Sequence, residues 1–125
     1  MIALDASALL AFLFREPGHE QVSAVLDNCC MSTVNLSEVL GRFVRDGHNG
    51  QAVWMRLQAT SIEFISFTSE QASIAAQLLP HTQPVGLSLG DRACLALALN
   101  RDIPAMTADR AWAQLSIGTV IQVIR

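Results

Sequence analysis

The stretch LSLGDRACLALAL, residues Leu87–Leu99, carries only two charged side chains, Asp91 and Arg92. Most residues around them are apolar or small on every side of a helical projection. The stretch therefore predicts a helix over about Ser88–Asn100 that is buried in the core. A carboxylate at the start of such a helix calls for an explanation, and that explanation depends on three other acidic residues far away in the sequence.

Short apolar segments rich in β-formers alternate with helical segments along the chain. Strands are expected at residues 1–4, 29–34, 62–67, within 103–109 and at 119–124. Helices are expected at residues 7–14, 19–26, 35–45, 51–59, 69–79, 88–100 and 110–115, with a loop after Pro80. This order predicts one α/β domain over residues 1–125, with a central, mostly parallel sheet between layers of helices.

The composition narrows the classes of function. The 125 residues are 51% hydrophobic and carry a net charge of -3, so no overall basic field attracts nucleic acid. All eight basic residues are Arg, which excludes any mechanism that requires a lysine. The three cysteines fit neither a disulfide framework nor a zinc site, and reduced thiols suit the cytoplasm. The apolar stretch at residues 7–14 is too short to span a bilayer and follows Asp5, so no membrane span or signal peptide is expected.

Four acidic residues follow predicted strands or open predicted helices. They are Asp5, Glu38, Asp91 and Asp109. In open parallel sheets, sites gather beyond the carboxyl ends of the strands, so all four can converge at one sheet edge.

Helix capping gives each acid an alternative role. Asn35 with Glu38, and Ser88 with Asp91, have the spacing of capping boxes, and Asp5 and Asp109 suit N-caps. If capping were their only role, however, it would be a coincidence that all four acids lie at one edge of the sheet. Converging carboxylates repel each other unless a cation neutralises them, and hard oxygen ligands favour Mg²⁺ or Mn²⁺.

The segments that hold these acids resemble the PIN domain family, and in particular its VapC-type toxins. The matching segments are ALDASALLAFLFREPG (3–18), NLSEVL (35–40), GLSLGDRACLALAL (86–99) and AMTADRAW (105–112). The last two, in this order and spacing, are the most specific. The resemblance implies a three-layer α/β/α fold, Mg²⁺-dependent endoribonuclease activity, a homodimer, and inhibition by a VapB-type antitoxin.

The resemblance also suggests roles for individual residues. Asp5 and Asp91 are the first candidates for direct metal ligands, and Asp109 is expected to bind directly or through water. Glu38 is expected to bind a second ion, or to hold and deprotonate the attacking water. Ser7 and Thr107 are candidates for orienting these carboxylates, with helix capping and β-propensity as their alternative roles.

Arginines near the acids are candidates for contacts to RNA phosphate, because guanidinium groups bind phosphate in a bidentate manner. The candidates are Arg92, Arg15 and Arg110, with Arg42 and Arg45 in addition. Pairing with a nearby acid or solvation on a helix face is the alternative role for each of them.

Three competing functions follow from the same pattern. A phosphorelay receiver domain has a similar length and an acidic magnesium pocket, but it needs a lysine that this chain lacks. A non-catalytic, dimeric RNA- or protein-binding module on the same fold is the main alternative. Cleavage of DNA is open on physical grounds, since carboxylates and metal do not read a 2′-hydroxyl.

Overall fold

The computed structural model describes all of residues 1–125 and contains one five-stranded sheet. The strands are β1 (Ile2–Leu4), β2 (Cys29–Ser32), β3 (Glu63–Ile65), β4 (Ala105–Thr107) and β5 (Ile121–Val123). Their order is β3-β2-β1-β4-β5 and every pair is parallel. All five predicted strands are present, and the predicted parallel sheet is confirmed.

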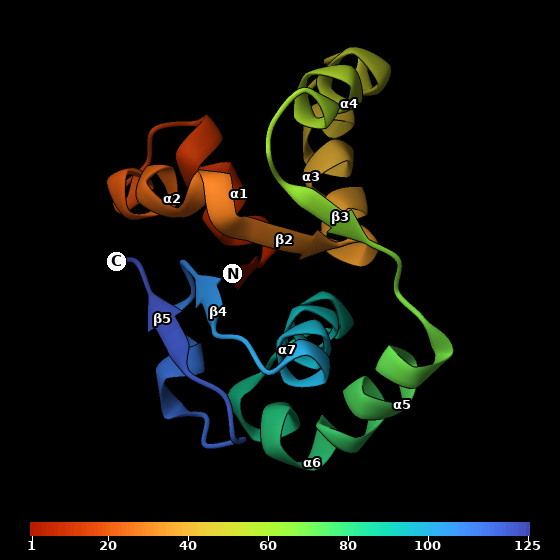
Figure 1. The fold of residues 1–125 in the computed structure, drawn as a ribbon, viewed down its shortest axis with the longest axis vertical. Coiled ribbons are helices and arrows are strands. Elements are labelled where there is room, and N and C mark those ends of the chain that lie inside the picture. Colours follow the sequence, from red (N-terminus) through yellow and green to blue (C-terminus); the bar gives the residue numbers. More distant parts are fainter.

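Helices cover both faces of this sheet (Figure 1). They are α1 (Ala6–Leu13), α2 (His19–Val25), α3 (Thr33–Arg45), α4 (Gly50–Gln58), α5 (Ser69–Gln77), α6 (Leu79–Thr82) and α7 (Leu89–Arg101), with 3-10 turns η1 (Leu26–Asn28), η2 (Gln83–Val85) and η3 (Arg110–Gln114). In Figure 1, α1 to α4 lie on one side of the sheet and α5 to α7 on the other. The fold is therefore the expected three-layer α/β/α sandwich. None of its helices has the length and apolarity needed to cross a membrane.

The strands divide their side chains between two hydrophobic clusters. Side chains alternate between the faces of a strand, so Ile2 and Leu4 join the cluster under α1 to α4. Ala3, Cys30 and Ala105 face the opposite cluster, which contains the core of α7. These three residues are small, and this allows α7 to pack closely on the sheet. Cys29 and Cys30 therefore lie on opposite faces, and all three cysteines are free and buried.

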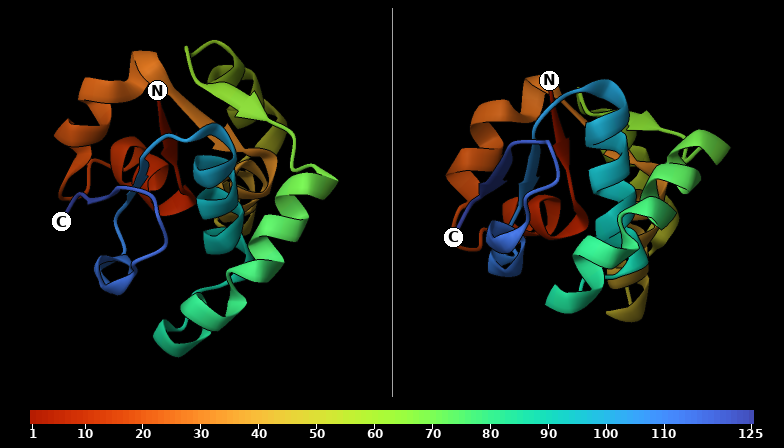
Figure 2. Two further views of the ribbon diagram at one scale, coloured as in Figure 1. Left: turned by 60° about the horizontal axis from the view of Figure 1, so that its bottom comes forward. Right: turned by 90° about the horizontal axis from the view of Figure 1, so that it is seen from below.

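Helix α7 is buried as the sequence predicts, and it contacts β1, β2, β4, α3 and α5 (Figure 2). Residues 93–98 are fully inaccessible to solvent. The helix begins with a complete capping box between Ser88 and Asp91 and ends at Asp102, which adopts the left-handed conformation. The position of Asp91 is thus fixed by the core behind it and by the cap in front of it.

Two predicted helix boundaries are wrong. Helix α3 begins at Thr33, and the Ser32 hydroxyl caps it by accepting a hydrogen bond from the Val34 amide at 3.2 Å. Asn35 is therefore inside the helix and does not form the predicted capping box. The loop expected after Pro80 is instead α6 followed by η2, because proline is compatible with the first turn of a helix.

Gly18 fixes the turn between α1 and α2 against β5. Its φ of +95° lies in the left-handed region, and a Cβ at this position would meet the Ile124 carbonyl oxygen and lie 2.8 Å from Ile124 Cγ1. Gln21 Nε2 donates to the same carbonyl at 3.2 Å. This turn therefore requires glycine for both its conformation and its close contact.

Candidate active site

The four acidic residues line one cleft of about 320 Å³ beyond the carboxyl ends of the central strands. Asp5 follows β1, Asp109 follows β4, Glu38 projects from the second turn of α3, and Asp91 projects from the first turn of α7. The complete lining is Asp5, Ala6, Ser7, Leu10, Glu38, Arg42, Arg45, Asp91 and Asp109. The topology thus brings together side chains that are more than 100 residues apart.

Asp5 is the most buried and most extensively bonded of these carboxylates. It is only 3% exposed. The Ser7 hydroxyl lies 2.7 Å from Oδ1 and 2.9 Å from Oδ2, the Ala8 amide donates to Oδ1 at 2.9 Å, and the Thr107 hydroxyl donates to Oδ2 at 2.8 Å. Asp5 therefore caps α1 and is also held in one orientation within the cleft.

Burial dominates the ionisation of Asp5. Loss of solvation raises the pKa of this carboxyl from 3.8 to about 6, and the nearby charge of Asp91 also acts to raise it. The hydrogen bonds from Ala8, Ser7 and Thr107 oppose the rise but do not cancel it. An ionised carboxylate is unfavourable in so buried a position unless a cation lies close to it.

Ser7 and Thr107 connect Asp5 to the backbone around Asp109. The Ser7 oxygen accepts from the Ala108 amide at 2.9 Å, and the Thr107 oxygen accepts from the Asp109 amide at 3.0 Å. Both hydroxyls therefore contact Asp5 directly and fix the start of the β4–η3 turn. Asp109 Oδ1 accepts from Ala111 at 2.9 Å and caps η3.

Asp91 caps its helix and also faces the cleft. Its Oδ2 accepts from the Ser88 amide at 2.9 Å, while its own amide donates to the Ser88 hydroxyl at 3.2 Å. Its Oδ1 makes no hydrogen bond within the chain and is available to the cleft. The two roles considered for these acids are therefore compatible in one side chain.

Asn35 holds Glu38 and contacts α7, a role in the site that the capping-box interpretation of this pair did not predict. The Asn35 amide nitrogen donates at 2.9 Å both to Glu38 Oε1 and to the Gly90 carbonyl of α7. Asn35 is 1% exposed, and a Cβ on Gly90 would lie 2.6 Å from the Glu38 carboxylate carbon. The i to i+3 spacing that suggests a capping box reflects this side-chain contact inside α3, whereas the contact with α7 depends on tertiary packing.

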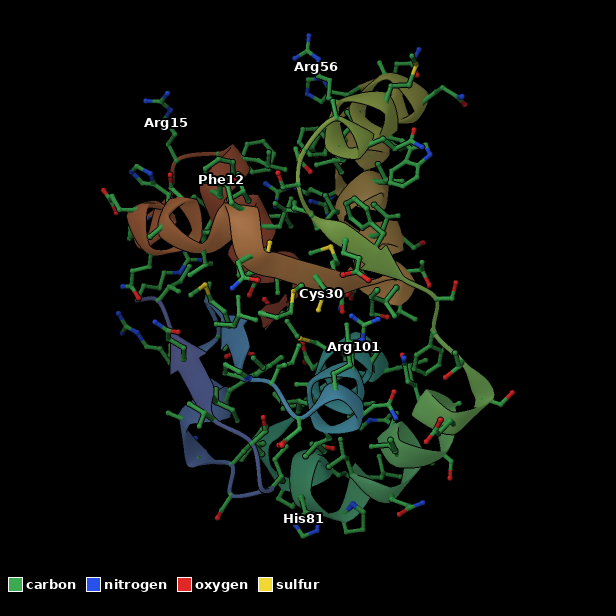
Figure 3. All side chains as sticks on the ribbon, viewed as in Figure 1. Phe12, Arg15, Cys30, Arg56, His81 and Arg101 are labelled. Carbon is green, nitrogen blue, oxygen red and sulfur yellow. The ribbon has the colours of Figure 1, made fainter.

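The structure places only part of the arginine set at the cleft. Arg92, which follows Asp91, points to α5 and donates to the Ala75 carbonyl at 3.2 Å, so it neither lines the cleft nor pairs with an acid. Arg15 extends outward from the turn after α1 (Figure 3). Arg110 donates to the Arg125 carbonyl at 3.1 Å. Arg42 and Arg45 line the cleft instead.

The chemistry of the lining suits a hard divalent cation. No cysteine or histidine lines the cleft, and its four carboxylates favour Mg²⁺ or Mn²⁺ over zinc. The chain contains no group of three His, Cys, Asp or Glu side chains arranged to hold a metal ion. Carboxylates are suitable ligands for Mg²⁺, which binds through one or two of them and keeps several waters.

Comparison with solved structures gives close similarity of fold at low sequence identity. A toxin–antitoxin complex from Klebsiella pneumoniae aligns with a TM-score of 0.72 at 19% identity, covering 97% of this chain and 100% of the other. DNA-bound VapBC from Salmonella typhimurium gives 0.76 at 15% identity, covering 99% and 98%. A VapC toxin from Mycobacterium tuberculosis, described as cleaving the sarcin–ricin loop, gives 0.74 at 18%, covering 96% and 99%.

Sequence comparison supplies the family. No curated protein matches the chain. The model of the PIN domain, however, matches residues 2–118, a range that includes all four acidic residues of the cleft. This chain belongs to the PIN domain family.

Proposed function

We propose that this protein is a metal-dependent endoribonuclease that hydrolyses RNA phosphodiester bonds. The observation that carries the proposal is the convergence of Asp5, Glu38, Asp91 and Asp109 on one cleft, with Asp5 buried and its pKa raised to about 6. Such a cluster is electrostatically unfavourable without a cation, and catalytic groups commonly have perturbed pKa values. We further propose that the protein is a cytoplasmic, homodimeric toxin of a VapBC-type pair, inhibited by a VapB-type antitoxin.

Asp5 and Asp91 are the proposed direct ligands of Mg²⁺ or Mn²⁺, and Asp109 would bind the ion directly or through a water. When bound, the metal would lower the pKa of a coordinated water and offset negative charge on the phosphate. Ser7 and Thr107 hold the Asp5 carboxylate in place, and the Ser88 cap holds Asp91. These side chains therefore need little reorganisation when substrate arrives, which favours rapid reaction.

Glu38 is the proposed residue that orients the attacking water and accepts its proton. Its Oε1 accepts a hydrogen bond from Asn35, and no hydrogen bond within the chain occupies Oε2. A carboxylate with one fixed oxygen and one available oxygen can hold a water in a defined position. A water that attacks in line with the 3′ oxygen as leaving group would leave a 5′ phosphate on the product.

The structural neighbours support the proposals that the substrate is RNA and that the protein is a toxin. One structural neighbour is described as a toxin that cleaves the sarcin–ricin loop, and others are complexes of VapB with VapC. A non-catalytic binding module on the same fold is the second candidate. It is favoured by the capping contacts of Asp5, Asp91 and Asp109, which give three of the four carboxylates a structural role without any metal.

Metal-dependent turnover separates these candidates. The purified, antitoxin-free protein is incubated with structured and unstructured RNAs in Mg²⁺, Mn²⁺ or EDTA. Asp91→Asn should abolish cleavage, because it replaces a proposed carboxylate ligand. The helix cap should be retained, because the asparagine side-chain oxygen can still accept the hydrogen bond from the Ser88 amide. Asp102→Asn is the matched control: it makes the same change at the exposed end of the same helix, in a left-handed position that asparagine tolerates.

Two results would reject the nuclease assignment. One is cleavage by Asp91→Asn at the wild-type rate. The other is binding of RNA and metal by a folded protein that cleaves none of the RNAs, which would support the binding module. Loss of cleavage in Asp91→Asn, with full activity in Asp102→Asn and none in EDTA, is the expected outcome.

A further inference from the structure

Helix α3 brings both acidic and basic side chains to the cleft. Glu38, Arg42 and Arg45 are separated by four and then three residues, so they lie on one face of the helix. All three line the same cleft. The acidic end of the cleft thus continues along α3 into a cationic end, while the other three carboxylates follow β1 and β4 or lie on α7.

Arg42 is held in place by two contacts outside the carboxylate cluster. Its Nε donates to Asp46 Oδ2 at 3.0 Å, and its guanidinium carbon lies 5.0 Å from the ring centre of Phe14. Phe14 in turn stacks on Phe43, with ring centres 5.2 Å apart. The hydrogen bond and charge of Arg42 lower the pKa of Asp46, so this pair is ionised at neutral pH.

The hydrogen-bonding capacity of Arg42 is mostly unused. Its terminal nitrogens make no hydrogen bond within the chain, and its side chain is 37% exposed. Neither Arg42 nor Arg45 forms an ion pair with any of the four carboxylates that share the cleft; their only acidic partner is Asp46. The terminal nitrogens of Arg42 are thus oriented but free to bind an anion.

We propose that Arg42, assisted by Arg45, binds a phosphate of the nucleic acid strand next to the one that reacts. The inference rests on the proposed function, because the position of the strand is set by the carboxylates. A planar guanidinium with free terminal N–H groups is suited to bidentate binding of phosphate oxygens. A phosphodiester strand that passes the carboxylates carries its neighbouring phosphates along α3.

A purely structural role for Arg42 makes different predictions. A cation in the last turn of a helix stabilises the helix dipole, and the pair with Asp46 could simply fix the end of α3. The variant Asp46→Asn separates the two roles, since it removes the ion pair but leaves the guanidinium. If Arg42 only stabilises the end of α3, Arg42→Ala and Asp46→Asn should have the same effect on RNA binding. If Arg42 contacts phosphate, only Arg42→Ala should weaken RNA binding.

The first measurement is binding of a short, fluorescently labelled, single-stranded RNA of mixed sequence, with all variants built on Asp91→Asn to prevent turnover. Anisotropy is recorded in Mg²⁺ between about 50 and 200 mM KCl. Arg42→Ala should weaken binding roughly tenfold, a loss in the range of hydrogen bonds to charged groups. It should also reduce the slope of log K against log salt by about 0.7, the value for one phosphate contact on a single strand.

Arg56→Ala is the matched control, because it removes the same charge from an exposed position on α4 outside the cleft. Arg56→Ala and Asp46→Asn should keep the original slope. The proposal is rejected if Arg42→Ala keeps the slope, if Arg56→Ala lowers it equally, or if Asp46→Asn behaves like Arg42→Ala.

Cleavage kinetics with Asp91 intact distinguish this proposal from the nuclease assignment. Arg42→Ala should raise KM about tenfold and leave kcat nearly unchanged, as expected for a contact made equally in the ground and transition states. If Arg42→Ala cleaves RNA with an unchanged KM, the phosphate contact is rejected and the nuclease assignment stands. A wild-type protein that cleaves nothing, but whose salt slope falls in Arg42→Ala, rejects the nuclease and supports the phosphate contact.

Discussion

Replacing Asp5 by asparagine should remove a pH-dependent loss of stability from the metal-free protein near neutral pH. Burial raises the pKa of Asp5 from 3.8 to about 6, so the folded state binds this proton more tightly than the unfolded state does. A raised pKa of an acid means that stability falls as pH rises from about 4 to about 6. The difference of about 2.2 between the two pKa values corresponds to a cost of about 3 kcal/mol above pH 6. An asparagine side chain cannot ionise and escapes this cost.

Urea denaturation in EDTA at pH 4, 5, 6 and 7 measures the effect. The quantity of interest is the change in unfolding free energy between pH 4 and 7 for wild type minus that for Asp5→Asn, because the other titrating groups cancel in this difference. Its size should be about 2.4 kcal/mol, because about 0.6 of the 3 kcal/mol is already lost at pH 4. The amide oxygen of the substituted side chain can still accept from Ala8, so the cap on α1 is retained.

Added Mg²⁺ supplies the second half of this test. Binding to the folded state alone stabilises a protein by about 2.7 kcal/mol at a metal concentration one hundred times Kd. Mg²⁺ should therefore stabilise wild type at pH 7 and leave Asp5→Asn nearly unchanged. Parallel pH profiles for the two proteins, or equal stabilisation by Mg²⁺, would refute the electrostatic reasoning about Asp5.

Two glycine substitutions test the packing around the cleft and the α1–α2 turn. Gly90→Ala places a Cβ against the Glu38 carboxylate and displaces it from Asn35, so cleavage should fall about ten- to a hundredfold. The melting temperature should stay nearly constant, because the gain from alanine in a helix offsets the lost hydrogen bond. A steep fall in melting temperature would contradict this reasoning. Gly18→Ala forces a side chain into a φ of +95° and against the Ile124 carbonyl, and should cost about 2 to 4 kcal/mol in urea denaturation, whereas a loss below about 0.5 kcal/mol would contradict the steric argument.

The sequence was sufficient to predict the strand and helix order because its apolar patterns are strong and separated by clear turn signals. It also predicted which acids would meet, since parallel strands leave their carboxyl ends at one edge. The start of α3 was misplaced because Thr33 and Val34 are β-branched and continue the apolar pattern of β2. The Ser32 hydroxyl, just before these two residues, decides the boundary.

The direction of individual side chains was harder to predict. Arg92 is adjacent to Asp91 in sequence, but neighbours in a helix point about 100° apart, so Arg92 faces α5 while Asp91 faces the cleft. The helical spacing from Glu38 to Arg42 and Arg45 was present in the sequence and is the more informative signal. The contact of Asn35 with Gly90 joins α3 to α7 and could not be read from either segment alone.

The position of β1 in the sheet has a consequence for the synthesis of the chain. β1 is first in sequence but central in the sheet, and Asp5 depends on hydrogen bonding with Met106 and Thr107. A chain emerging from the ribosome therefore exposes Asp5 to water, with an ordinary acidity, until residues 105–109 have been made. We expect the emerging chain to be inert, with all four carboxylates assembling together only once β4 has been translated and has paired with β1.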